Sequence, residues 1–229
     1  MSLPPLPGRR DHGRVDYYLI SAAAGDPEPA GILVEEFVLG EDHTTTAIDS
    51  AAWEPRAGSW AGASALTREL RSDAGLRARV AAVDRPAAAR ALTVLGGGEL
   101  PDEARLRALF QRQPLPAGAP LDLGTEPAAR RYRILFAGLL GERELAGART
   151  ALRLEPADDP RVAGTARDDA GGHGFTWELR RIGAGIAWCV DVTVRPGQGD
   201  VTALGALLHH HRQAIRRLGL IPVTVERFA

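Results

Sequence analysis

The chain has 229 residues, of which 45% are hydrophobic and 25% charged, and its formal net charge is -1; this composition is typical of a folded globular protein and excludes a disordered or fibrous one. All 28 basic residues are arginine, and Cys189 is the single cysteine. The sequence therefore excludes P-loop and Schiff-base lysines, internal disulfides and cysteine-rich metal sites, and we expect no cofactor.

No apolar run approaches the roughly 20 residues that a membrane-spanning helix needs. The first residues have neither the charged nor the apolar region of a signal peptide. We therefore expect a cytoplasmic protein that does not bind membranes. The absence of lysine and asparagine fits a bacterial genome of high GC content.

The first half predicts a hairpin followed by helices. The β-rich runs 15–21 and 31–39 flank the turn-forming residues 25–29. Apolar residues then take helical spacing at 63, 66 and 70. A second helix is expected from Arg85 to the glycines at 96–98, and a third is expected to open at 100–103, where a proline and two acids stand in the first turn. This half therefore predicts an α+β module.

Trp53 and Trp60 lie seven residues apart, on either side of a short segment rich in turn-forming residues. They are candidate binding residues, because two tryptophans can form the aromatic edge of a pocket. Tryptophans beneath a loop more often form a satellite of the core. The sequence leaves both alternatives open.

Residues 113–129 interrupt the periodic pattern with four prolines and two glycines, which indicates a linker. We expect one module in residues 1–112 and a second in residues 130–229. Residues 1–129 hold 13 arginines and 18 acids, a net of -5, and residues 130–229 hold 15 arginines and 11 acids, a net of +4; these sum to -1. Opposite charges favour docking of the two modules, or of two copies of the chain as a homodimer.

The second half alternates apolar and polar residues. This period of two predicts strands over 131–136, 149–154, 175–180 and 188–194, with a turn at 183–185 before the last of them. A helix is expected from Val201 to Leu218, followed by Gly219 and a strand over 221–228. The predicted fold is α+β: two small modules, the second an antiparallel sheet of four or five strands with one face covered by the C-terminal helix.

The alternation places charged side chains opposite the apolar face of this sheet. Such a face is commonly a solvated ladder of cross-strand ion pairs. Alternatively, its arginines would bind the acidic surface of a protein partner or a small anionic ligand, because a guanidinium fork suits carboxylate and phosphate. Nucleic acid is disfavoured, because the net charge is near zero and no aromatic residues are interleaved. The candidate binding residues on this face are Arg133, Arg149, Arg153 and Arg180.

Three consecutive histidines, 209–211, lie in the predicted helix. Neighbouring helical side chains point about 100° apart, so the three cannot converge on one metal ion. His211 falls in the apolar stripe with Leu204, Leu208 and Ile215, whereas His209 and His210 fall on the polar side. His211 is therefore expected to be a buried core residue, with a general acid/base in a cavity between helix and sheet as the alternative.

Residues 168–174 contain two aspartates and a histidine on a glycine-rich segment. A mobile loop that covers a site, or a metal-binding loop, would use such residues. However, the two aspartates lack the alternating spacing of the acids in a calcium-binding loop. We therefore predict a solvated loop and no metal site.

Two functions remain open. The first is a non-catalytic binding or adaptor protein that uses the arginine-bearing sheet face, because no nucleophile, base and orienting residue occur together. The alternative is a small metabolic enzyme in which His211 acts as acid/base, with Asp191 and Glu226 as further catalytic candidates.

Overall fold

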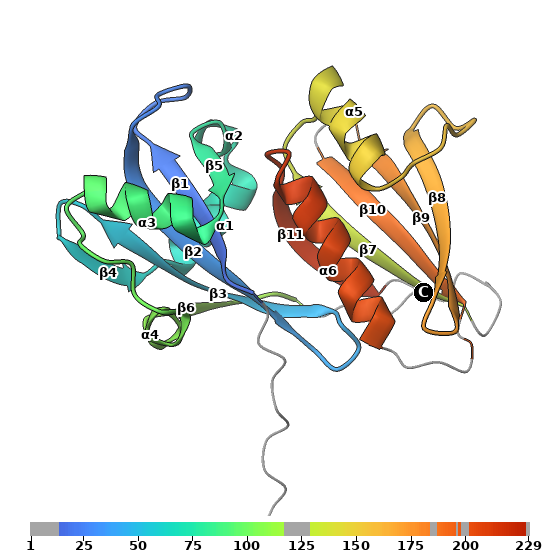
Figure 1. The fold of residues 1–229 in the computed structure, drawn as a ribbon, viewed down its shortest axis with the longest axis horizontal. Coiled ribbons are helices and arrows are strands. Elements are labelled where there is room, and N and C mark those ends of the chain that lie inside the picture. Colours follow the sequence, from blue (N-terminus) through green and yellow to red (C-terminus); the bar gives the residue numbers. More distant parts are fainter. Residues whose placement is uncertain (1–13, 117–128, 184–186, 196, 198–201, 228–229) are drawn as a thin grey trace, which may run out of the picture.

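The computed structural model describes residues 14–116, 129–183, 187–195, 197 and 202–227. Two antiparallel sheets lie side by side, each with its own helices, and one long helix lies between them (Figure 1). The chain is thus an α+β protein, as the sequence predicts, and its second half is an antiparallel sheet of five strands that carries the C-terminal helix.

Six strands form the first sheet in the order β4-β3-β2-β1-β5, and β6 pairs with β3 as well. Its strands are β1 (Asp16–Ser21), β2 (Pro29–Leu39), β3 (Thr45–Glu54), β4 (Ser59–Gly62), β5 (Val80–Val83) and β6 (Gln111–Pro114). The predicted hairpin is β1 and β2. Residues 113 and 114, predicted to begin the linker, belong to β6, and residues 117–128 of that linker lie outside the described residues.

Helices cover both faces of the first sheet. They are α1 (Ser64–Ser72), α2 (Ala74–Arg77), α3 (Arg85–Val94) and α4 (Glu103–Ala108). Successive residues of β1 point to opposite faces, so Tyr17 packs in the core with α3 and α4, whereas Tyr18 packs with α1 and α2. The predicted start of α3 is confirmed, since Pro86 stands in its first turn and Asp84 caps it.

The second sheet has the order β11-β7-β10-β9-β8. Its strands are β7 (Arg130–Ala137), β8 (Val162–Ala170), β9 (His173–Ile182), β10 (Ala187–Arg195) and β11 (Ile221–Arg227), and its helices are α5 (Glu142–Ala151) and α6 (Thr202–Arg216). Apolar side chains of α5, α6 and the strands form one core. Residues 131–136, 175–180 and 188–194 are strands, as predicted, and so is the predicted strand 221–228 up to residue 227, since residue 228 lies outside the described residues.

The predicted strand over 149–154 is wrong, because most of this segment belongs to helix α5 and its end. Ala148 and Leu152 are four residues apart and are both buried, which is the spacing of one helix face. Two acids in the first turn and Arg149 in the last match the helix dipole. The alternation of residues 150, 152 and 154 is thus incidental, because a helical period fits the longer segment.

The predicted solvated loop over 168–174 is also wrong. Residues 168–170 end β8, residues 173 and 174 begin β9, and the two strands pair up to Ala170 and His173. Only Gly171 and Gly172 form the turn, with φ angles of 57° and 77°. A two-residue hairpin turn needs positive φ at both positions, which glycine adopts without strain.

Helix α6 contacts both halves of the protein. Leu204, Leu208 and Ile215 face the second sheet, whereas Arg212 and Arg216 face the first half. A Cβ atom on Gly205 would lie 2.9 Å from a ring carbon of His43, which belongs to the turn between β2 and β3. The absence of a side chain at Gly205 therefore allows the helix to approach this turn closely.

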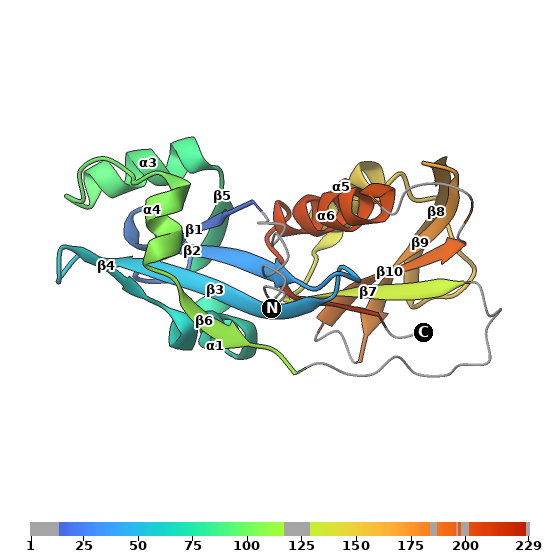
Figure 2. The same cartoon turned by 90° about the horizontal axis from the view of Figure 1, so that it is seen from below.

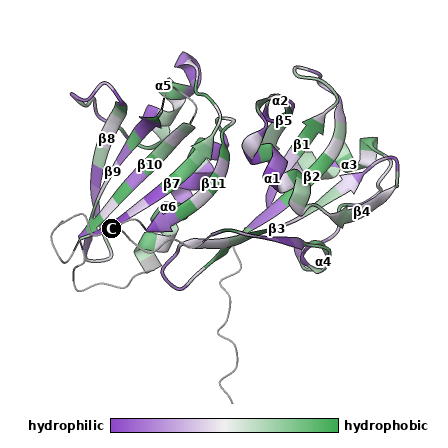
Figure 3. Cartoon of the chain, turned by 180° about the vertical axis from the view of Figure 1, so that it is seen from behind, coloured by the Kyte–Doolittle hydropathy of each residue, from purple (hydrophilic) through white to green (hydrophobic). Residues whose placement is uncertain are grey.

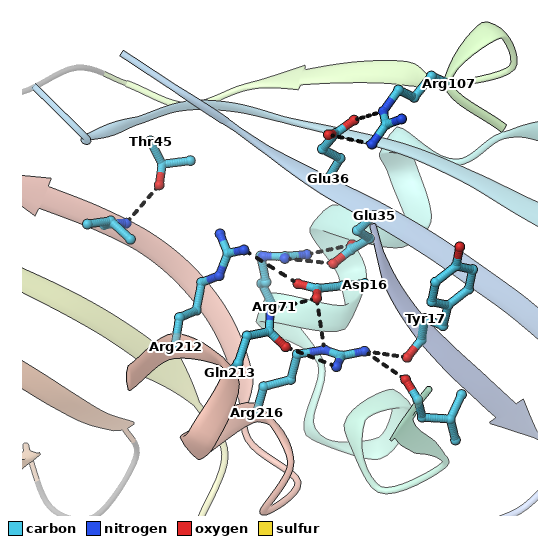
Figure 4. Close-up of polar contacts among 12 residues, drawn as sticks. Asp16, Tyr17, Glu35, Glu36, Thr45, Arg71, Arg107, Arg212, Gln213 and Arg216 are labelled. Carbon is cyan, nitrogen blue, oxygen red and sulfur yellow. Dashed lines mark hydrogen bonds and ion pairs between the residues drawn. The ribbon is translucent and has the colours of Figure 1, made fainter. Parts of the chain in front are cut away.

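A buried polar cluster holds α6 against the first half (Figure 4). Asp16 of β1 accepts a hydrogen bond of 2.7 Å from Gln213, and its carboxylate lies 3.6 Å from Arg216 and 3.9 Å from Arg212. Arg216 also donates to the carbonyl of Tyr17. Asp16, Arg212 and Arg216 are each at most 5% exposed. These charges are therefore removed from water and depend on one another.

Aromatic rings complete this contact. The guanidinium of Arg216 lies 4.5 Å from the ring centre of Tyr18, and that of Arg212 lies 4.2 Å from the ring centre of Phe37. Arg71 of α1 approaches the same phenylalanine ring at 5.7 Å while it binds Glu35 with two hydrogen bonds of 2.9 Å. Cation–π contacts of this kind gain strength where water is excluded.

No helix among the described residues is long and apolar enough to cross a membrane.

Removing the charge of Asp16 should destabilise the protein strongly. In Asp16→Asn, the buried Arg212 and Arg216 lose their counter-charge, so we expect the free energy of unfolding to fall by about 3 kcal/mol. The same change in the more exposed Asp49–Arg112 pair, whose side chains are 19% and 44% exposed, should have an effect of less than about 1 kcal/mol. Denaturant unfolding of Asp16→Asn and Asp49→Asn measures both, and equal effects would contradict this role of Asp16.

Candidate functional site

One face of the second sheet is not covered by any element among the described residues. Helices α5 and α6 both lie on the face that carries Trp177, Trp188 and Val190 (Figure 2). Because side chains alternate along a strand, the residues between these point to the opposite face, which we call the outer face. Figure 3 shows hydrophilic and hydrophobic segments alternating along these strands.

The outer face is hollowed into a groove with a volume of about 930 Å³. Strands β8, β9 and β10 line it, together with Arg131 of β7 and the residues that follow α5. Its charged residues are four arginines, Arg131, Arg153, Arg167 and Arg180, and three acids, Glu155, Glu178 and Asp191. Four positive and three negative charges leave the lining with a net charge of +1.

One cross-strand row of the outer face has its central carboxylates bound by arginines. The register places Arg133 opposite both Asp191 and Glu226, and places Glu178 opposite Asp191. Arg133 binds Asp191 through two hydrogen bonds of 2.7 and 2.6 Å, and this bond raises the pKa of the arginine. A bidentate pair of this kind holds both side chains in a fixed geometry.

Arg180 is held in the same way. It donates to Glu178 at 2.8 Å and to Asp159 at 3.2 Å, and the bond to Glu178 raises its pKa. Arg133 and Arg180, two of the predicted binding residues, are thus engaged by neighbouring carboxylates. Their direct effect on the outer face is to neutralise Asp191 and Glu178.

A second row carries arginines that have no such partner. Arg131, Thr193, Thr176 and Arg167 stand opposite one another across four adjacent strands. Within the described part of the chain, neither Arg131 nor Arg167 forms a side-chain hydrogen bond or ion pair, and the same holds for Arg153 at the end of α5. The Nε atom of Arg131 is buried and has no hydrogen-bond partner in the described part of the chain. These three guanidinium groups remain available to a ligand.

The sequence did not indicate Arg131 and Arg167 as candidate residues of this face, and it wrongly placed Arg149 there. Arg149 lies on α5, and its Nε donates to the carbonyl of Ala163 at 3.0 Å. Arg131 is two residues from Arg133, so alternation alone could have found it. Arg167 lies on β8, whose small and polar residues gave no strand signal. Arg153 does line the groove, but it follows a helix.

Cys189 is also on the outer side of β10, opposite Arg180 and Leu135. It is fully buried, and burial raises the pKa of its thiol to about 12. A thiol with this pKa is protonated near neutral pH and is a weak nucleophile. Cys189 is therefore a packed small residue.

His211 lies on the other side of the sheet from Asp191 and Glu226. It is 1% exposed, as predicted for a core residue, and its ring centre is 4.9 Å from that of Trp177. Neither ring nitrogen has a hydrogen-bond partner among the described residues, and burial lowers the pKa of His211 to about 3. His210 is exposed, but His209 is half-buried rather than largely exposed. The structure does not bring the three candidate catalytic residues together.

Trp53 and Trp60 form a cross-strand pair in the first sheet. They stand opposite each other on β3 and β4, and their ring centres are 5.9 Å apart in an edge-to-face arrangement. Trp53 is 8% exposed and belongs to the core shared with α3. The pair lies in the other half of the molecule and does not line the groove.

No group of three or more potential metal-ligating side chains occurs among the residues that the structure describes.

The buried histidine should make stability depend on pH. The pKa of His211 falls from 6.5 to about 3 on folding, so the unfolded chain binds a proton between these pH values and the folded protein does not. The free energy of unfolding should then decrease as pH falls below 6.5, with His211 contributing up to about 1.4 kcal/mol per pH unit. Replacing His211 with leucine should remove this contribution.

Denaturant unfolding between pH 4.5 and 6.5 measures the effect. The same substitution at the exposed His210 is the matched control and should leave most of the pH dependence in place, because burial, rather than the charge of His210, is the main cause of the lowered pKa of His211. Equal slopes for the two variants would show that the imidazole of His211 is not buried in its neutral form.

No protein-family model matches this sequence, and a search of curated proteins finds no significant relative.

Proposed function

We propose that the chain is a non-catalytic binding protein of the cytoplasm that recognises an acidic segment of a partner protein through the groove of the outer face. One observation carries the proposal: Arg131, Arg153 and Arg167 line the groove without an ion-pair partner among the described residues, although carboxylates stand on the same face. Arginine forks of this kind suit carboxylate and phosphate groups.

The ion-paired row supports this proposal. Asp191 and Glu178 would repel an acidic partner if they were free, but Arg133 and Arg180 neutralise them. The remaining unpaired charge of the lining is therefore mainly positive, with Glu155 as the exception. Such a surface would speed the approach of an acidic partner more than it would tighten the final complex.

The shape and lining of the groove favour an extended protein segment over a small molecule. The groove crosses four strands, a width of about 14 Å at the usual strand spacing. Small-molecule pockets are usually enclosed and mainly apolar, whereas this groove is open on one side and lined mainly by charged and hydroxyl side chains. Nucleic acid is disfavoured, because proteins bind its bases by stacking them on accessible aromatic rings. The indole of Trp177 is buried, and its N–H donates to the carbonyl of Leu152.

The enzyme alternative has less support. A general acid/base must reach the substrate, but His211 is buried in the core and lies on the opposite side of the sheet from the groove.

Removing the three free arginines should abolish most of the binding to an acidic chain. We expect the triple variant Arg131→Ala, Arg153→Ala, Arg167→Ala to bind a fluorescein-labelled oligoglutamate peptide at least about tenfold more weakly than the unaltered protein, equivalent to about 1.4 kcal/mol. The affinity of the variant should also depend less on salt. Fluorescence anisotropy at several salt concentrations measures both effects.

The matched control removes three exposed arginines elsewhere, Arg56, Arg90 and Arg217. This control changes the net charge by the same amount and should retain the affinity. An equal loss in the two triple variants would mean that only net charge matters, and no binding by the unaltered protein would contradict the proposed function. Thermal unfolding of both variants checks that the fold is intact, because substitutions of exposed residues usually change stability by less than about 0.5 kcal/mol.

A further inference from the structure

The arginine–threonine row has the layout of a clamp for one oxyanion. Arg131 and Arg167 occupy its two ends, and Thr193 and Thr176 lie directly opposite each other in its middle. All four residues line the groove. Because neighbouring strands are about 4.8 Å apart, the two arginine Cα atoms are separated by about 14 Å, and each side chain spans about half of this distance to reach the threonines.

The number of donors indicates which oxyanion fits. Two guanidinium forks supply about two N–H groups each, and the two threonine hydroxyls bring the total to about six donors. A carboxylate has two oxygens with about four acceptor positions and a single charge. A phosphate monoester has three terminal oxygens and a charge of about -1.5 to -2 at neutral pH, which matches two arginines.

The surroundings of the row favour a doubly charged guest. The nearest carboxylates on the same strands are Asp191, Glu178 and Asp169. Asp191 and Glu178 are bound by arginines, and Asp169, two residues from Arg167 on β8, stands in the same cross-strand row as Arg195. Glu155 pairs with Thr165 on the edge of the sheet, beside the row of Asp191 and Glu178 rather than the clamp.

We infer that this row binds one phosphate monoester group, carried by a phosphorylated side chain in the acidic segment of the partner. The inference rests on the proposed function and specifies what the groove recognises. Arg131 and Arg167 hold the phosphate from opposite ends, and Thr176 and Thr193 donate to it from the floor of the groove. Arg153 lies outside the row and contacts the flanking carboxylates of the segment.

The test compares three labelled peptides that differ at one position. An oligoglutamate peptide carries serine, phosphoserine or glutamate at its centre, and fluorescence anisotropy measures the affinity of each. The unaltered protein should bind the phosphoserine peptide at least about tenfold more tightly than the other two, equivalent to about 1.4 kcal/mol. In the double variant Arg131→Gln, Arg167→Gln, the three affinities should become equal.

Two further variants separate the clamp from general charge. Arg153→Gln should weaken binding of all three peptides by a similar factor and keep the preference for phosphoserine. Thr176→Val with Thr193→Val should reduce that preference severalfold, because valine preserves the shape of threonine and strand propensity but removes the hydroxyl donor. A preference unchanged in the threonine variant would overturn the role of the row.

Failure of this inference can be told apart from failure of the proposed function. Equal binding of the three peptides by the unaltered protein overturns the phosphate clamp and leaves the acidic-segment proposal standing. No binding of any peptide overturns both. Inorganic phosphate and phenyl phosphate serve as competitors. If either competitor displaces the phosphoserine peptide at a concentration equal to the dissociation constant of that peptide, the site takes a free phosphate ester rather than a protein segment.

Discussion

Arg212 and Arg216 leave helix α6 on the side away from the second sheet and enter the first half, where Asp16 lies between them. The opposite side of the same helix packs on the second sheet through its leucines and Ile215. One helix thus buries two different surfaces, one apolar and one charged. The arrangement of the two sheets depends on the charged surface of the helix. An apolar contact is non-directional, whereas paired charges and hydrogen bonds fix an orientation. With α6 on one face of the second sheet, the outer face is the one that no described element covers.

The cost of burying these charges explains why the contact is so extensively bonded. A buried arginine without a counter-charge would destabilise the fold by several kcal/mol. Gln213, the carbonyl of Tyr17 and the rings of Tyr18 and Phe37 all contact the cluster. Each contact replaces part of the hydration that the guanidinium groups lose. The first half of the sequence has a net charge of -5 and the second half a net charge of +4. In this cluster an acid of the first half, Asp16, meets an arginine of the second half, Arg216.

The outer face divides its charges between two adjacent rows. In one row Arg133 binds Asp191, and Arg180 reaches into the same row from the position next to Glu178 and binds that glutamate. In the next row threonines occupy the positions between the arginines, and neither arginine is bound by a carboxylate of the described residues. This difference arises only from the register, because a shift of one strand by two residues would move Asp191 into the row of Arg131. The proposed function therefore depends on strand pairing as much as on composition.

The sequence by itself determined the α+β class, most strands of the second sheet, the C-terminal helix and the burial of His211, because these follow from periods of two and 3.6 residues that are local properties of the chain. It also placed Arg133 and Arg180 opposite the apolar face of the sheet. Alternation cannot show which arginines are free, because that depends on which carboxylate the neighbouring strand places opposite each of them. It failed at α5, where a short alternation coincides with a helix, and at β8, where small and polar residues carry no strand signal. Only the tertiary structure could decide that Arg131 and Arg167 end one row while Arg133 is bound to Asp191, because cross-strand register is a contact between residues far apart in the sequence.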